Sequence, residues 1–340
     1  MERYVEKKTL SNSVYQPIRL SFLAAALLAL ASCSKDTREI GSQERPFQIA
    51  FIPTDDTQQI LSGAETLSKY LETKISQKLY GKDTGFYVKA SVPQSYSVVI
   101  EAISTKRIDL ASLDTFSYSL LKDRNYEAEA IVSTIRFGTQ KSYRGQILVH
   151  VDSGINKLED LNGKKFAFVD PSSPAGYILP IALFKEHGVK IGEEVFANRH
   201  DNVVTMIYQK QVDGGATYHS PAIEVEKNGK KVMEIQDARA KVLTQFPDVE
   251  KKIKILDYTA DIPNGPWVLR KNIFSDQKKN DAVKEALQAA LVSYGETPEG
   301  QLVLKSLHNI SGLEKSSDKD FDGIRAFFKK SELDLKGLVK

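Results

Sequence analysis

The chain has 340 residues, of which 41% are apolar and 27% charged, and its 47 basic and 44 acidic residues give a net charge of +3. This length suits two domains, or one domain with two lobes, around a sizeable core. The near balance of charge argues against a nucleic-acid partner, which would require a basic surface, and the single cysteine excludes an intramolecular disulfide.

The N-terminal segment has the pattern of a lipoprotein precursor. Residues 22–31 are an unbroken apolar run, which is too short to span a bilayer comfortably and which follows the basic residues Arg3, Lys7, Lys8 and Arg19. The run leads into Ser32 and Cys33, the only cysteine, in an arrangement that resembles a bacterial lipobox. We therefore predict that residues 1–32 are a signal peptide and that Cys33 is lipidated, in preference to a buried cysteine in an uncleaved anchor helix.

Cleavage before Cys33 would leave 43 basic and 42 acidic residues, a net charge of +1. Residues 33–45 are polar and charged, and we predict a lipidated flexible tether. The sequence beyond them contains no further apolar run of membrane-spanning length. We expect a protein tethered by its lipid to the bacterial cell envelope, extracytoplasmic and facing the periplasm in a Gram-negative organism. Which membrane holds the lipid stays open, although Ser34 after the cysteine favours the outer one.

The first half of the remaining chain alternates strand and helix patterns. The expected strands are 47–52, 85–90, 108–112 and 128–134, and the expected helices are 58–79, 98–103 and 115–122. The 58–79 segment carries apolar residues at helical spacing. Such alternation is typical of a helix-covered parallel sheet, so residues 46–143 are predicted to be a first lobe.

A second series of the same kind follows. The expected strands are 146–151, 165–169, 212–217, 253–258 and 267–270, and the expected helices are 156–161, 178–187, 203–210, 282–294 and 298–307. Thr297, Pro298 and Glu299 form a favourable helix start. We predict that residues 144–257 form lobe 2 and that residues 258–340 return to lobe 1 with the C-terminal helices. The predicted fold class is thus α/β with two lobes.

Five segments in this order resemble the phosphate/phosphite/phosphonate-binding components of ABC transporters. They are FIPTDDTQQI (51–60), SYSVVIEAISTKRIDLASLDTFSY (95–118), GTQKSYRGQILVHVDSGINKLEDLNGKKFAFVDPSSPAGYILP (138–180), RHDNVVTMIYQKQVDGGATY (199–218) and IPNGPWVLRKNI (262–273). Any one segment is weak evidence, but five in order are fairly specific. The resemblance implies the type II periplasmic-binding-protein fold, with two crossover strands and a ligand cleft between lobes. It also implies a monomeric binding protein that delivers a small anion to an ABC permease.

The turn after strand 165–169 is the main candidate site. The family commonly has Asp-Pro-x-Ser-Thr-Ser-Gly there, wrapped around the oxyanion, whereas residues 170–176 read Asp-Pro-Ser-Ser-Pro-Ala-Gly. Pro174 and Ala175 remove two hydroxyls and one N–H from that set. The donors that remain are the hydroxyls of Ser172 and Ser173 and the amides of Ala175 and Gly176. The local residues alone favour a plain helix start with Ser173 as N-cap, whereas the resemblance favours an anion site at a helix N-terminus.

The resemblance also points to side chains outside this turn. Tyr96 matches a tyrosine that hydrogen-bonds the oxyanion, and His200 matches a histidine that contacts it, as an imidazolium or as a neutral N–H donor. Thr115 is either a donor from across the cleft or an ordinary helix cap. Tyr218, together with His219 and Trp267, is predicted to line the pocket.

Two departures from the family bear on the ligand. Members that bind aminoalkyl phosphonates place acids where this chain has His219-Ser220 and Asn264-Gly265-Pro266. An ammonium group buried without a partner is costly, so we expect phosphate, phosphite or a small phosphonate with a neutral tail, or a different small anion in a repurposed cleft.

Two other function classes compete with that of a transport protein. A sensor of the same fold would report ligand state to a receptor kinase in the envelope. An enzyme is disfavoured because the sequence has no HExxH, P-loop, GxSxG or reactive cysteine, and Asp55-Asp56 are most simply a helix cap. The five histidines lack metal-ligand spacing, so neither a metal nor a cofactor is expected.

Overall fold

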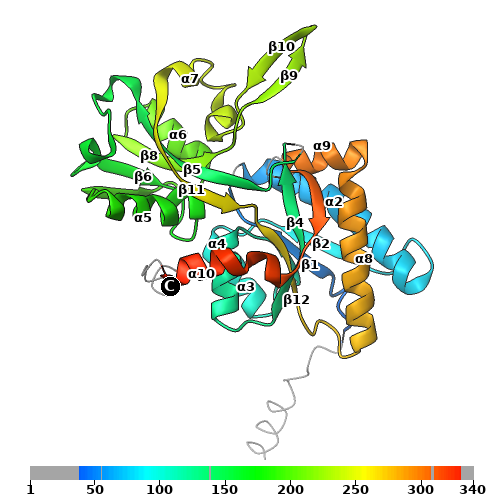
Figure 1. The fold of residues 1–340 in the computed structure, drawn as a ribbon. Coiled ribbons are helices and arrows are strands. Elements are labelled where there is room, and N and C mark those ends of the chain that lie inside the picture. Colours follow the sequence, from blue (N-terminus) through cyan, green and yellow to red (C-terminus); the bar gives the residue numbers. More distant parts are fainter. Residues whose placement is uncertain (1–37, 55, 138, 308–309, 331–340) are drawn as a thin grey trace, which may run out of the picture. The chain divides into compact units, whose positions relative to one another are not determined.

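The structure is a computed structural model that describes residues 38–54, 56–137, 139–307 and 310–330 (Figure 1). The described residues from Ile40 onward belong to one compact unit. The predicted signal peptide and Cys33 lie outside the described residues, so lipidation stays a prediction.

The first lobe is built on a six-stranded sheet in the order β13-β4-β12-β3-β1-β2. Its strands are β1 (Phe47–Phe51), β2 (Val88–Ser91), β3 (Leu110–Ser112), β4 (Ala128–Arg136), β12 (Pro266–Arg270) and β13 (Ile310–Lys315). β1 pairs in parallel with β2 and β3, whereas β12 and β13 run antiparallel to their neighbours. The sheet therefore combines a parallel series with later strands that return to it.

The second lobe has a five-stranded sheet in the order β11-β5-β8-β6-β7, and a separate hairpin joins β9 to β10. The strands are β5 (Ser142–His150), β6 (Lys165–Phe168), β7 (Glu193–Phe196), β8 (Gly214–His219), β9 (Ile223–Lys227), β10 (Lys230–Glu234) and β11 (Ile253–Pro263). β6 is parallel to β7 and β8, and β5 is antiparallel to β8 and β11. The prediction of a two-lobed α/β fold is confirmed. The expected parallel pairing is present in both sheets, but each sheet is mixed, because the strands next to the crossings are antiparallel.

Helices cover both faces of the first sheet (Figure 1). One face carries α2 (Thr57–Tyr80), α8 (Gln277–Gly295) and α9 (Pro298–Ser306), and the other carries α3 (Tyr96–Ser104), α4 (Thr115–Asp123) and α10 (Asp322–Lys330). Side chains alternate across a strand, so Phe47, Ile49 and Phe51 of β1 enter the core beneath α2 and α8, while Ala50 enters the core beneath α3 and α4.

The second sheet is covered in the same way. α5 (Leu179–Glu186) packs Phe184 edge-on against Phe166 of β6, with ring centroids 5.2 Å apart. α6 (His200–Tyr208) buries Val203 and Ile207 on the opposite face. A short helix, α7 (Val249–Lys252), leads into β11. Four 3-10 helices complete the described part, at Val151–Ser153, Leu158–Leu161, Ala238–Val242 and Asp318–Phe321.

The chain crosses between the lobes twice, from β4 to β5 and from β11 to β12, and Asn264 ties the two crossings together. The Nδ2 group of Asn264 donates hydrogen bonds to the Thr134 carbonyl at 3.0 Å and to the Gln140 carbonyl at 2.7 Å. The next residue, Gly265, passes so close to Leu113 that a Cβ atom would overlap the Leu113 carbonyl. These contacts fix the crossings beside the space between the lobes.

Candidate functional site

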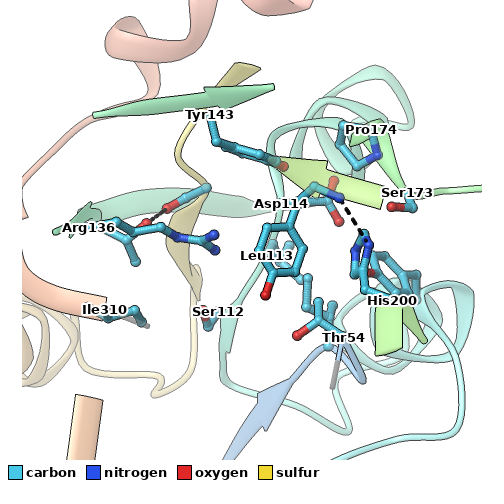
Figure 2. A pocket seen from close by; sticks show the side chains of 15 residues that line it. Thr54, Ser112, Leu113, Asp114, Arg136, Tyr143, Ser173, Pro174, His200 and Ile310 are labelled. Atoms are coloured by element: carbon cyan, nitrogen blue, oxygen red, sulfur yellow. Dashed lines mark hydrogen bonds between the residues drawn. The ribbon is translucent and has the colours of Figure 1, made fainter. Parts of the chain in front are cut away.

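A small cavity of about 50 Å³ lies between the two lobes (Figure 2). A cavity holds a water once it offers roughly 10–15 Å³ of such space, so this one has room for only a few non-hydrogen atoms. Polar or charged side chains from both lobes line it: Thr54, Tyr96, Ser112, Asp114, Thr134, Arg136, Tyr143, Ser173, His200 and Tyr218. The cavity therefore suits a small polar ligand.

Direct contacts between the lobes surround the cavity. The backbone N–H of His200, on the second lobe, donates to the Thr54 carbonyl of the first lobe at 3.2 Å. Nearby, Arg199 lies 3.9 Å from the carboxylate of Asp56. The Asp170 carboxylate accepts a hydrogen bond from the Tyr96 backbone N–H across the same boundary. The lobes are thus closed around this space.

The turn after β6 forms a capped helix start. Ser173 is the N-cap, its Oγ accepts the Gly176 N–H at 3.1 Å, and Pro174 opens a π-helical turn, Pro174–Ile178, that runs into α5. The amides of Tyr177 and Ile178 both donate to the Ser173 carbonyl, each at 3.0 Å. The capping expected from the local residues is therefore present, and the turn brings Ser173 and Pro174 to the cavity.

The other donors predicted in this turn have different surroundings. Ser172, Ala175 and Gly176 do not line the cavity, and the Gly176 amide already donates to Ser173. Gly176 also meets a packing requirement, because a Cβ atom there would lie 2.5 Å from Cγ2 of Val169. The predicted cradle of four donors is thus reduced, in this arrangement, to the hydroxyl of Ser173.

Tyr96 reaches the cavity from the first turn of α3 and is 1% exposed. Burial raises the pKa of its hydroxyl well above the ordinary value, and the charges of Asp114 and Asp170 raise it further. The phenol is therefore neutral and retains its proton. Its hydroxyl interacts with the side chain of Ser173, so the two predicted donors meet across the boundary between the lobes.

His200 and Tyr218 also line the cavity and pack against each other edge to face, with ring centroids 4.9 Å apart. Burial lowers the pKa of His200 to about 3, so the imidazole is neutral. Its Nδ1 accepts the Tyr218 backbone N–H at 3.3 Å, which is the dashed contact at His200 in Figure 2. The ring proton accordingly sits on Nε2, which favours the neutral N–H donor over the imidazolium.

Thr115 is fully buried at the start of α4 and is absent from the cavity lining, whereas its neighbour Asp114 is part of it. Asp114 is the N-cap of α4, and its Oδ1 accepts the N–H groups of Phe116 at 2.9 Å and Ser117 at 2.8 Å. The capping role that the sequence left open for Thr115 belongs to Asp114. A buried carboxyl group is thereby placed at the site.

Sequence reasoning missed Arg136, which supplies the one cation among the described residues that line the cavity. Its guanidinium lies over the Tyr143 ring at 5.3 Å from the centroid, and its Nε is buried without a hydrogen-bond partner among the described residues. The charge also acts on His200, whose pKa it helps to lower. The feature of the sequence that could have pointed to Arg136 is its place at the end of β4, just before the chain crosses to the second lobe.

Two residues predicted to line the pocket lie elsewhere. Trp267 is in the core of the first lobe, edge-on to Phe51 at 5.4 Å. His219 packs on Tyr258 and its Nδ1 lies 3.8 Å from Asp237. Asn264 faces backbone carbonyls, as described above. The absence of acids at positions 219 and 264 therefore does not leave the site without a carboxylate, because Asp114 provides one.

Among the described residues, no cluster of three or more metal-ligating side chains was found. No helix in the described ranges is long and apolar enough for a membrane crossing.

Known proteins resemble this chain in sequence and fold. Residues 49–321 match the model of a family described as the periplasmic phosphonate substrate-binding proteins of ABC transporters. The chain belongs to this family. Its members are binding proteins of extracytoplasmic transport systems, which are expected to work with a permease and a small ligand.

Curated relatives support the same family. The phosphonates-binding periplasmic protein of Escherichia coli is 24% identical over 301 residues, which cover 85% of this chain and 78% of that protein. A phosphate-import protein of Mycolicibacterium smegmatis is 27% identical over 219 residues, which cover 60% of this chain and 65% of that protein.

Solved structures share the type II periplasmic-binding-protein fold. The binding component of a Pseudomonas aeruginosa ABC phosphonate transporter has a TM-score of 0.66 at 20% identity, covering 87% of each chain. A Prochlorococcus marinus protein, solved in complex with methylphosphonate, has a TM-score of 0.65 at 16% identity, covering 84% of this chain and 97% of that one.

Proposed function

We propose that this chain is a lipid-anchored binding protein that captures one small phosphorus oxyanion (phosphate, phosphite or a small phosphonate) in the cavity between its lobes and delivers it to an ABC permease. The anchor is the lipid on Cys33, as the sequence predicts. The protein's work is binding and closure, without chemical conversion of the ligand.

The observation that carries this proposal is the position of Arg136. Its guanidinium faces the cavity of about 50 Å³ between the lobes, together with neutral donors from Tyr96, Ser173 and His200. A guanidinium recognises oxyanions through charge-assisted hydrogen bonds, and a neutral hydroxyl or imidazole N–H adds donors without adding charge. The small volume favours phosphate or methylphosphonate over a nucleotide or a sugar phosphate.

The test is thermal unfolding of the purified full chain, kept in mild detergent, with phosphate, phosphite, methylphosphonate, 2-aminoethylphosphonate or sulfate. A ligand at 100 times its dissociation constant adds about 2.7 kcal/mol to the free energy of unfolding, which is an easily measured shift. We expect a clear shift with at least one phosphorus oxyanion. If none of them shifts the transition at millimolar concentration, the proposal is wrong and the cleft serves another ligand.

A further inference from the structure

The side chain of Asp114 is the feature of the cavity that a simple anion site does not explain. It is 7% exposed, lines the cavity, and accepts three hydrogen bonds: two at Oδ1 from backbone amides, and one at Oδ2 from the Ser117 hydroxyl at 2.7 Å. An ionised carboxylate offers about four acceptor positions. One position on Oδ2 is therefore left over beside the space where the ligand would sit.

The groups that face Asp114 come from several elements. Burial raises the pKa values of Tyr96 on α3 and Tyr143 on β5, and the charge of Asp114 raises them further. The charge of Asp170, which follows β6, helps in turn to raise the pKa of Asp114. Arg136 on β4 supplies the positive charge at the cavity, whereas His200 on α6 is neutral.

Burial is the main reason that the pKa of Asp114 rises from 3.8 to about 7, and the nearby charge of Asp170 adds to the effect, against the hydrogen bonds from Ser117 and Phe116. One guanidinium group and one carboxyl group therefore lie beside a single small cavity, and the carboxyl group exchanges its proton near neutral pH.

We propose that Asp114 is the residue that determines which anions this site accepts, because an oxyanion binds in the cavity only when one proton is shared between the Asp114 carboxyl group and the ligand. An ionised carboxylate can only accept hydrogen bonds, so a fully ionised oxygen placed beside it would be repelled. One proton between them turns this repulsion into a short charge-assisted hydrogen bond.

The inference rests on the proposed function and gives it a selectivity rule. Phosphate and phosphonate groups undergo their second ionisation near neutral pH, as phosphate esters do near pH 6, so they bring a proton with them or take one up readily. Sulfate stays fully ionised and must rely on a proton already on Asp114. The site is therefore expected to favour phosphorus oxyanions over sulfate. For inorganic phosphate, whose dianion still carries a proton, this preference should grow as the pH rises above about 7.

The test is calorimetric titration of the full chain with inorganic phosphate, methylphosphonate, 2-aminoethylphosphonate and sulfate from pH 6 to pH 9. Asp114→Asn keeps an N-cap residue of equal quality but carries a permanent N–H donor, and Asp114→Ser is a second neutral cap. Asp123→Asn is the matched control, since it removes a carboxylate from the far end of α4, where Asp123 pairs with Lys329 at 3.1 Å.

For the wild type we expect sulfate affinity to fall about tenfold per pH unit above pH 7, and sulfate binding at pH 8 to be accompanied by the uptake of one proton. In Asp114→Asn, sulfate affinity at pH 8 should rise at least tenfold, the proton uptake should vanish, and the preference for phosphate should collapse. Asp123→Asn should behave as the wild type does. A merely structural Asp114 would not change the proton uptake.

Unchanged selectivity and proton uptake in both Asp114 variants, in a protein that binds phosphate, would overturn the inference alone. It would also be overturned if Asp114→Asn lost 2-aminoethylphosphonate binding but kept the wild-type ratio of phosphate to sulfate affinity, because Asp114 would then hold an ammonium group. If the wild type bound none of the oxyanions, the proposed function would fail and this inference with it.

Discussion

His200 shows how burial sets the chemistry of a single residue at the site. The ring is 4% exposed and is held by the Tyr218 amide, and its pKa is lowered from 6.5 to about 3. The sequence alone left two states open for this side chain, because the neighbours that bury it come from distant parts of the chain. The folded protein keeps the neutral form throughout the physiological range.

The neutral state of His200 predicts a specific dependence of stability on pH. The unfolded chain protonates this histidine below pH 6.5, whereas the folded chain does not until about pH 3, so the free energy of unfolding falls as the pH drops below 6.5. At pH 4.5 the penalty is roughly 3 kcal/mol. Urea unfolding at pH 7.5 and at pH 4.5 gives the stability that each protein loses between these two pH values. This loss should be smaller in His200→Gln than in the wild type by about 3 kcal/mol. An equal loss in both proteins would show that His200 is accessible to protons in the folded state.

Arg136 and Asp114 show why the list of site residues was incomplete. Neither residue belongs to a motif: Arg136 lies at the end of a strand, and Asp114 reads as part of an ordinary helix start. Their importance arises because the two crossings bring β4 and the start of α4 next to the turn after β6. Arg136 lies outside the segments that resemble the family, and Asp114 lies within one of them (95–118) without matching a ligand-contacting residue. Tyr96, Ser173 and His200 could be named from the sequence because each matches a particular residue of that family.

At the scale of elements, the periodic segments were predictable and the edges of the lobes were not. The long helix α2 and the helix α9 with its Thr297 cap follow from apolar spacing and capping residues, and both are present. Four strands (β7, β9, β10 and β13) and two α-helices (α7 and α10) were missed. β7 and the hairpin are largely exposed, so they lack the apolar pattern on which a strand prediction depends.

The turn after β6 allows a test of its packing. Gly176→Ala would place a methyl group 2.5 Å from Cγ2 and 2.6 Å from Cβ of Val169, so either the strand end or the π-helical turn must move. Overpacking of this kind usually costs about 1–3 kcal/mol, which urea unfolding can measure. The control is Gly323→Ala in α10, where no atom lies within 4 Å and alanine favours the helix. Equal stability of the two variants would mean that the turn adapts without cost.

At the scale of the whole molecule, the described body from Ile40 onward is a pair of α/β lobes joined by two crossings that Asn264 holds together. The alternation of strands and helices was sufficient to predict the two lobes. The closed cavity was beyond prediction, because its lining comes from many separate segments whose meeting depends on how the lobes close.

A small oxyanion is proposed to bind in this cavity against Arg136. The most direct test is calorimetric titration of the full chain carrying Arg136→Met, which measures its affinity for phosphate and for methylphosphonate. The matched control is Arg144→Met on β5, an exposed arginine that pairs with Asp261 at 2.5 Å outside the cavity lining. Loss of a charged hydrogen bond is worth about 1.5–3 kcal/mol, so Arg136→Met should bind roughly 10- to 150-fold more weakly and Arg144→Met should bind as the wild type does. Equal affinity in the wild type and in Arg136→Met would contradict the account.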